Sequence, residues 1–196
     1  VNTDLLEKLD KLRNKVAHRK SIPPYVVFQD VSLEEMAASF PLTIEDLTHI
    51  NGVGLGKAKK FGLEFISIIK AFVEDNNLET TANIFVKTSV NKSKNKIKII
   101  QGIDAKVDLE ELAENQTISF DELLEEMEHI INSGTRLSVD YYLSSFMDEE
   151  SIEDIYDYFM EVPSDDFELA REELGEEYSD QEIKLVHIKF ISEVAN

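Results

Sequence analysis

Residues 50–62, INGVGLGKAKKFG, place three glycines between two segments in which apolar residues recur every three or four positions. Apolar side chains at this spacing line one face of an α-helix. Glycine has no Cβ atom, so it lets the backbone turn sharply and approach a neighbouring segment. The stretch therefore predicts a helix, a tight turn and a second, longer helix. The inner face of that longer helix is expected to carry Phe61, Phe65, Ile68, Ile69 and Phe72.

The rest of the sequence repeats the helical pattern between clear start and stop signals. In the first half, Leu5, Leu9, Leu12 and Val16 share a helical face, and Pro23-Pro24 ends that element. A capping box is a Ser or Thr followed three residues later by an acid, and it marks a helix start. We predict N-terminal caps or boxes at Ser32 with Glu35, Thr43, Asp108 with Glu111, Ser119 with Glu122, and Ser179 with Glu182, helix ends at Pro41 and Gly134, and an all-α fold.

The charge of the chain is divided unevenly along its length. Residues 1–100 hold 15 Lys and Arg against 12 Asp and Glu, whereas residues 101–196 hold 5 against 28. Such a difference between halves indicates two modules with different surfaces. We predict one domain over residues 1–78, a basic linker over residues 79–105 and an acidic helical domain over residues 106–196. The segment KIKII at residues 96–100 is the one place where a short extended segment is expected.

Several classes of function are excluded by residues that the sequence lacks. It has no cysteine, hence no disulfide and no thiolate metal site. The four scattered histidines, the acidic clusters and the absence of a nucleophile–base pattern predict no catalytic residue, no metal and no cofactor. No apolar run reaches the roughly 18 residues of a membrane span, so we expect a cytoplasmic protein that does not contact the membrane. Because the sequence begins at Val1, we expect a piece of a longer chain.

The glycine and lysine stretch matches neither of two familiar phosphate motifs. A P-loop would need a glycine where Asn51 stands and Ser or Thr where Ala58 stands, and a dinucleotide fingerprint would need a glycine at Lys59. One interpretation is a helix start whose free N–H groups and nearby lysines bind phosphate. The alternative is a tight helix crossing with solvated lysines. The candidate anion-binding residues are Gly52, Gly54, Gly56, Lys57, Lys59 and Lys60.

Three motifs resemble the HRDC family, the helicase-and-RNase-D C-terminal module of RecQ-type DNA helicases and ribonuclease D. They are LRNKVAHRKSIPPYVVFQD, LEEMA and INGVGLGKAKKFG, and the resemblance covers roughly residues 5–72. It implies a compact bundle of about five helices that acts as an auxiliary nucleic-acid-binding unit. Family members vary between basic and acidic surfaces, so binding to DNA does not follow for each of them.

Residues 108–143 resemble more loosely the helix-turn-helix module that follows HRDC in some bacterial RecQ proteins, and YSDQEIKLV near the end fits the same pattern. The helix expected to enter a DNA groove departs from this comparison, because it carries five acids and no Lys or Arg. Groove binding needs positive charge against phosphate. We therefore expect this second domain to contact protein rather than DNA. The acids are Asp121, Glu122, Glu125, Glu126 and Glu128.

The resemblance implies the C-terminal region of a bacterial RecQ-like helicase, acting in unwinding, recombination and repair. Its expected partners are single-stranded or branched DNA, bound weakly, the helicase core of the same protein, and other proteins through the acidic half. ATP and Mg²⁺ would serve a motor outside this region. Tyr25 is a candidate base-stacking residue beside Arg19 and Lys20. The alternative is an interaction or autoregulatory module that contacts the helicase core without touching DNA.

Overall fold

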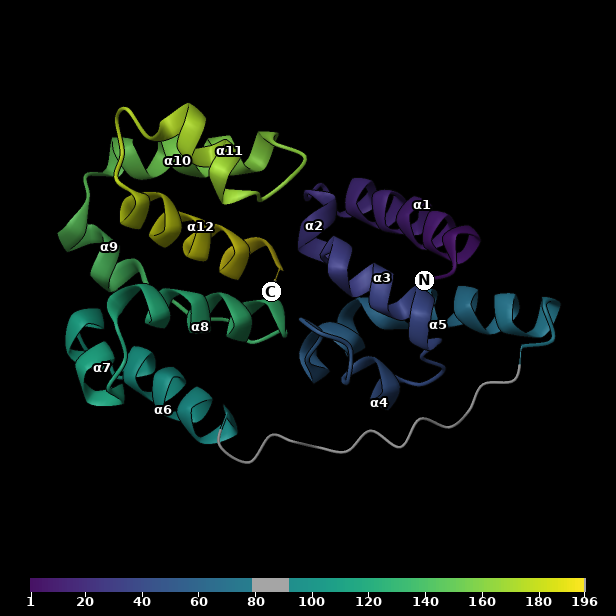
Figure 1. The fold of residues 1–196 in the computed structure, drawn as a ribbon. Coiled ribbons are helices and arrows are strands. Elements are labelled where there is room, and N and C mark those ends of the chain that lie inside the picture. The colour runs from purple at the N-terminus through teal and green to yellow at the C-terminus, as the bar shows by residue number, and fades with distance from the viewer. Residues whose placement is uncertain (79–91, 196) are drawn as a thin grey trace. The chain divides into compact units, whose positions relative to one another are not determined.

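The computed structural model describes residues 1–78 and 92–195, and all twelve secondary-structure elements in those ranges are α-helices. Figure 1 shows these helices in two groups. Within the described residues the all-α prediction is confirmed. The chain divides into two compact units, the first containing α1–α5 and residues 132–135, the second containing the rest of α6–α12.

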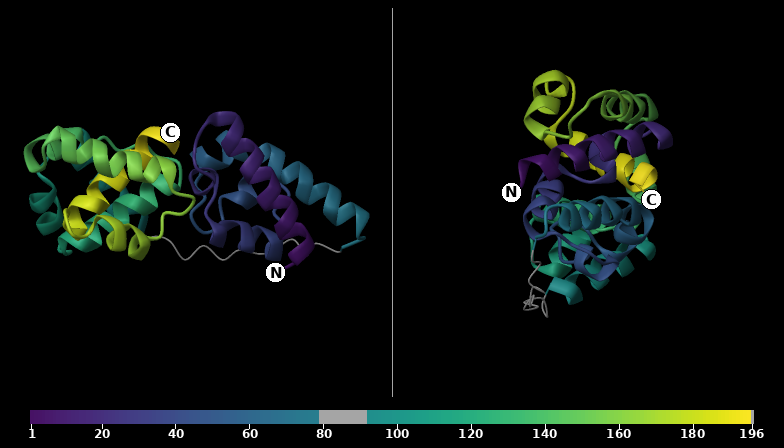
Figure 2. Two further views of the ribbon diagram at one scale, coloured as in Figure 1. Left: turned by 90° about the horizontal axis from the view of Figure 1, so that it is seen from above. Right: turned by 90° about the vertical axis from the view of Figure 1, so that its right-hand side faces the viewer.

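The first unit is a five-helix bundle, as the family resemblance implied. Its helices are α1 (Thr3–Lys20), α2 (Pro24–Val27), α3 (Asp30–Ser39), α4 (Ile44–Leu47) and α5 (Leu55–Asp75). The long helices α1 and α5 pack against each other, and both are seen in the left view of Figure 2. The ring of Phe28 lies edge-on to that of Phe65, with the ring centres 4.8 Å apart. These aromatic contacts fix the bundle around one apolar core.

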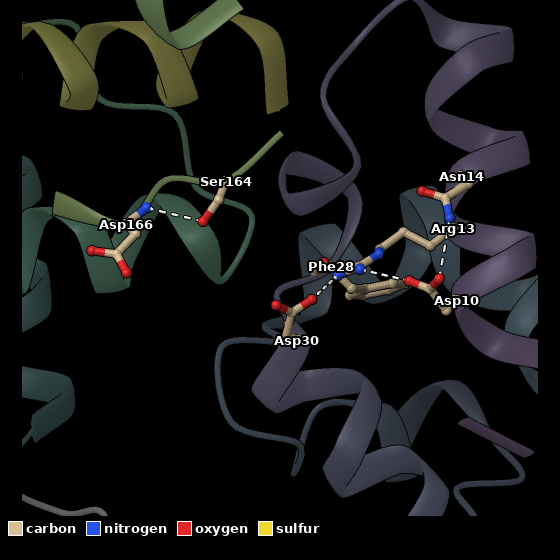
Figure 3. A network of polar contacts seen from close by, with 7 residues as sticks. All are labelled: Asp10, Arg13, Asn14, Phe28, Asp30, Ser164 and Asp166. Atoms are coloured by element: carbon tan, nitrogen blue, oxygen red, sulfur yellow. Dashed lines mark hydrogen bonds and ion pairs between the residues drawn. The ribbon is translucent and has the colours of Figure 1, made fainter. Parts of the chain in front are cut away.

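A buried arginine ties the segment between α2 and α3 to α1. The Arg13 guanidinium donates to the carbonyl oxygen of Phe28 at 2.9 Å and forms ion pairs with Asp10 and Asp30, both at 2.7 Å (Figure 3). Arg13 is 8% exposed, whereas both acids reach solvent. The guanidinium therefore satisfies a buried backbone acceptor while two surface carboxylates balance its charge.

The predicted capping box of Ser32 and Glu35 is wrong. Helix α3 begins three residues earlier than this box implies, at Asp30, and its N-cap Gln29 makes no side-chain cap bond. Ser32 instead donates to the carbonyl oxygen of Asn51 at 2.7 Å, and Glu35 accepts from the Asn51 N–H at 2.9 Å. The two side chains thus hold both backbone groups of the residue that precedes the glycine turn. We call Ser32, Glu35 and Asn51 the turn clamp.

The turn clamp should stabilise the first unit measurably. Ser32 is 1% exposed, so Ser32→Ala would leave a backbone carbonyl without its partner in a closed environment, at a cost of about 1–2 kcal/mol. Amide hydrogen exchange of the full chain should show faster exchange at residues 50–53 and across the first unit. Ser39→Ala is the matched control, because the Ser39 hydroxyl donates only within its own helix, to Glu35. Equal protection in the two variants would contradict the assignment.

The second unit contains α6 (Lys92–Asp104), α7 (Leu109–Gln116), α8 (Phe120–Asn132), α9 (Asp140–Phe146), α10 (Glu149–Glu161), α11 (Phe167–Leu174) and α12 (Asp180–Ala195). Helix α12 contacts α9, α10 and α11 and is the most buried of these helices, since successive residues from Leu185 to Ile188 are all shielded from solvent. Ahead of α11, the Asp166 N–H donates to Ser164 (Figure 3). The core of this unit therefore forms around its last helix.

Two of the predicted helix starts in this unit are confirmed in full. Ser119 and Glu122 exchange hydrogen bonds of 2.8 and 3.1 Å at the start of α8, and Ser179 and Glu182 exchange bonds of 2.7 and 3.3 Å at the start of α12. Asp108 caps α7 through the N–H groups of Glu110 and Glu111. Thr43 in the first unit forms its box with Asp46. These local signals place helix starts correctly because both partners lie on one turn.

The structure corrects the second part of the predicted basic linker. Residues 92–104 form helix α6 rather than a linker ending in an extended segment, while residues 79–91 of that stretch lie outside the described residues. Ile99 and Ile103 are 1% and 2% exposed, and α6 packs on α7. Their spacing of four residues puts both on one helical face, and burial of that face outweighs the alternating pattern of KIKII.

Candidate nucleic-acid interface

The glycine stretch forms the predicted turn between two helices of the first unit. Gly52 has φ +76°, and a Cβ atom built there would lie 3.3 Å from the Ser32 hydroxyl, so this position requires glycine. Gly54 is the N-cap residue of α5, and Gly56 lies in the first turn of that helix. Val53, between Gly52 and Gly54, is buried. Phosphate binding by this backbone stays a prediction.

The three lysines that follow the turn do not share one surface. Lys57 is 2% exposed, and it lies four residues before Phe61 and eight before Phe65, on the inner face of α5. Lys59 and Lys60 are exposed on the outer face. The interpretation of all three as mobile surface charges is therefore wrong for Lys57. Lys59 is turned about 200° from Lys57 around the helix axis, and Lys60, about 60° from Lys57, still reaches solvent.

The ring of Phe61 lies close to lysines from two helices. The ammonium groups of Lys20, in α1, and Lys60, in α5, lie 5.7 and 5.3 Å from the centre of the Phe61 ring. Both distances are within the range of a cation–π contact. Partial burial and then repulsion from Lys20 lower the pKa of Lys60 below its usual value. Two like charges beside one ring favour an anion that would lie near both and relieve their repulsion.

Arg19 is oriented by an acid of α5. Its guanidinium forms an ion pair and a hydrogen bond with Glu64, and both side chains are about half exposed. The hydrogen bond from Arg19, with nearby positive charge, keeps the pKa of Glu64 below its usual value. Arg19 thus lies in the same region as Lys20 and Lys60, but part of its charge is already balanced. We call Lys20, Lys59 and Lys60 the basic cluster.

Tyr25 is placed in α2 and is 6% exposed, although it does not belong to the apolar core cluster of the first unit. Stacking of a base requires an open ring face. The burial fits the interpretation as a packed aromatic better than the interpretation as a stacking platform. Base stacking by Tyr25 stays a prediction, and Tyr25 is not part of the basic cluster.

Helix α8 of the second unit carries acidic side chains where a helix that binds a DNA groove would need basic ones. Asp121, Glu122, Glu125 and Glu126 of α8 are exposed, and Glu128 lies 3.1 Å from Nδ1 of the buried His187. Helix α8 has no Lys or Arg. Within the described ranges, no group of three or more histidine and acidic side chains could hold a metal ion, and none of the helices described is long and apolar enough to cross a membrane.

The protein has two parts. The first is a five-helix bundle of the HRDC type with a glycine turn, and the second is an acidic helical unit. Residues 2–69 match the family model of the HRDC domain, and residues 93–143 match that of the RecQ-1-like helix-turn-helix domain. The two matches are consistent with a C-terminal RecQ region. The second match also begins at α6 and so includes the helix that the sequence patterns did not predict.

Curated relatives match part of this chain. The chain is 42% identical over 67 residues to a protein of Haemophilus influenzae, and 38% identical over 71 residues to one of Bacillus subtilis, both named ATP-dependent DNA helicase RecQ. The aligned segments cover 34% and 36% of this chain but only 11% and 12% of the relatives. The similarity therefore concerns a small part of those proteins.

Proposed function

We propose that this chain is the accessory C-terminal region of a RecQ-like DNA helicase and that its basic cluster binds single-stranded DNA weakly. The observation that carries the proposal is the pair of ammonium groups of Lys20 and Lys60 on the Phe61 ring, with Lys59 exposed beside them on α5. A phosphate placed between two such groups would be attracted by both. ATP hydrolysis and its Mg²⁺ belong, in this proposal, to a motor elsewhere in the helicase.

The proposed contact is local because the first unit has no overall positive charge. Residues 1–78 hold ten Lys and Arg and eleven Asp and Glu. Attraction to DNA must therefore arise from segregation of the lysines at the adjoining ends of α1 and α5. The total charge of -20 repels DNA from the chain as a whole and limits affinity. Weak binding that falls steeply with salt follows from this arrangement.

A second candidate function is protein contact by the acidic unit. The exposed acids of α8 favour it, since they would repel phosphate and attract basic surfaces. The helicase core of the same protein is one such partner. This function is compatible with DNA binding by the first unit, because the two use different residues.

Removing the basic cluster should weaken DNA binding and make it less dependent on salt. About three phosphate contacts predict a slope near -2 in a plot of log K against log salt for a single strand. In Lys20→Ala/Lys59→Ala/Lys60→Ala the slope should approach zero, and affinity at about 0.05 M salt should fall about tenfold. The measurement is fluorescence anisotropy of a labelled oligothymidine titrated with the full chain.

The matched control removes three other lysines of the same unit. Lys8→Ala/Lys11→Ala/Lys15→Ala makes the same change in net charge away from the cluster, and should change DNA affinity by less than about threefold at 0.15 M salt, where the Debye length is about 8 Å. Circular dichroism checks the fold of both variants. Unchanged slope and affinity in the cluster variant would disprove the DNA site, and equal losses in both variants would show that binding is not confined to it.

A further inference from the structure

A groove in the first unit shares no residue with the basic cluster and lies between the middle of α1 and the C-terminal part of α5. It has a volume of about 420 Å³. Its floor is apolar and is made by Leu12, Ile68, Ala71 and Phe72. Leu12 and Ile68 pack against the core of the bundle yet remain only partly buried, and Ala71 is exposed. The bundle thus leaves an apolar strip open to solvent along the seam of its two longest helices.

Three lysines border one side of this groove. Lys8, Lys11 and Lys15 come from α1 at spacings of three and four residues, and all three are exposed. They therefore form a row about 10 Å long parallel to the floor. Within the described part of the chain no ion pair involves them. Asp75 is the single acid that borders the groove, so the rim is mainly positive.

This combination fits an acidic amphipathic helix better than a nucleic acid. Open aromatic faces on which bases can stack add to the affinity for a single strand. The one aromatic residue of the floor, Phe72, is 6% exposed, and the Lys8 ammonium lies 5.7 Å from its ring centre. A helix laid along a groove instead uses aliphatic anchors at helical spacing, and acids beside those anchors repeat at the spacing of the lysine row.

We propose that the α1–α5 groove binds an acidic amphipathic helix of a partner protein, with apolar side chains on the floor and carboxylates against Lys8, Lys11 and Lys15. An acidic protein segment fits this groove because the rim is mainly positive and the floor is mainly aliphatic. The groove and the basic cluster have no residue in common, so peptide binding and DNA binding can be tested separately.

The test uses the full chain and a fluorescein-labelled peptide of about 15 residues that carries a leucine stripe beside a glutamate stripe at helical spacing. Anisotropy should show saturable binding. Lys8→Ala/Lys11→Ala/Lys15→Ala should weaken it about tenfold, because three rim pairs are lost. Ala71→Arg should weaken it at least as much by filling the groove, although that change adds positive charge. Replacing the peptide's glutamates by glutamine should reproduce the effect of the lysine variant.

The matched control is Lys20→Ala/Lys59→Ala/Lys60→Ala, which should keep peptide affinity within about twofold while losing DNA affinity. The exposed position of Ala71 makes Ala71→Arg informative even if the lysine variant fails to fold. No binding of the peptide by the unaltered chain, or unchanged affinity in Ala71→Arg, would overturn the proposal. Displacement of the peptide by oligothymidine, with DNA affinity lost in the groove lysine variant, would show a nucleic-acid surface and overturn it as well.

Discussion

Arg13→Met is expected to lower the free energy of unfolding of the first unit by about 3 kcal/mol. Methionine fills much of the same volume but cannot donate to the Phe28 carbonyl, which would then be left buried without its partner. The change also removes two ion pairs whose acids partly reach solvent, and these add little. Hydrogen exchange of the α1 and α5 amides in the full chain measures the loss within this unit.

The control for Arg13 separates the buried bond from the surface charge. Asp30→Asn removes one ion pair while the guanidinium keeps its bond to Phe28, and the Asp30 side chain is 82% exposed. It should therefore cost less than about 1 kcal/mol. If Arg13→Met cost no more than this control, the guanidinium would be a surface group held by its ion pairs rather than a support for the segment between α2 and α3.

Ser192→Val should destabilise the second unit by about 2–4 kcal/mol. The Ser192 hydroxyl accepts from the N–H of Leu137 at 2.9 Å and donates to the carbonyl oxygen of the same residue at 2.5 Å. Both residues are 1% exposed. Valine is larger than serine by one methyl group and cannot hydrogen-bond, so the variant leaves two buried backbone groups unpaired and creates no cavity. Chemical unfolding of the full chain, with hydrogen exchange of the α12 amides, measures the effect.

Ser144→Ala is the matched control in this unit. Its hydroxyl is exposed and makes a long bond of 3.4 Å to Tyr141 within the same helix. The change should remain within about 0.5 kcal/mol of the unaltered chain. A similar small effect for Ser192→Val would mean that water reaches Leu137 and replaces the hydroxyl.

The helical fold was predictable because its signals are local. The boxes at Ser119 with Glu122 and Ser179 with Glu182 need only one helical turn to form, so the sequence alone places them. Ser32 and Glu35 have the same spacing but a different role, since both reach a residue 16 or more positions away. No local pattern distinguishes a capping box from such a long-range contact, because the outcome depends on which distant residue packs against the helix.

The site was less predictable than the fold. Lys57, Lys59 and Lys60 look equivalent in the sequence, and only the register set by Phe61 and Phe65 turns Lys57 inward. That register was available, since the apolar face of this helix was correctly predicted. The approach of Lys20 to Lys60 was not, because it depends on how α1 packs against α5. The groove beside Lys8 and Lys15 was not predictable either, because it also depends on how α1 packs against α5.

The pairing of α1 with α5 has a consequence for how two ligands would influence each other. Lys60 and Phe72 are twelve residues, about 18 Å, apart along α5, whereas Lys20 and Lys15 are five residues, about 7.5 Å, apart along α1. Only the first of these distances clearly exceeds the Debye length of about 8 Å at 0.15 M salt, and both are shorter than the value of about 30 Å at 0.01 M. At physiological salt the repulsion between a bound phosphate strand and a bound acidic helix is therefore confined to their groups near Lys15 and Lys20, whereas in dilute buffer it extends over the whole of both ligands.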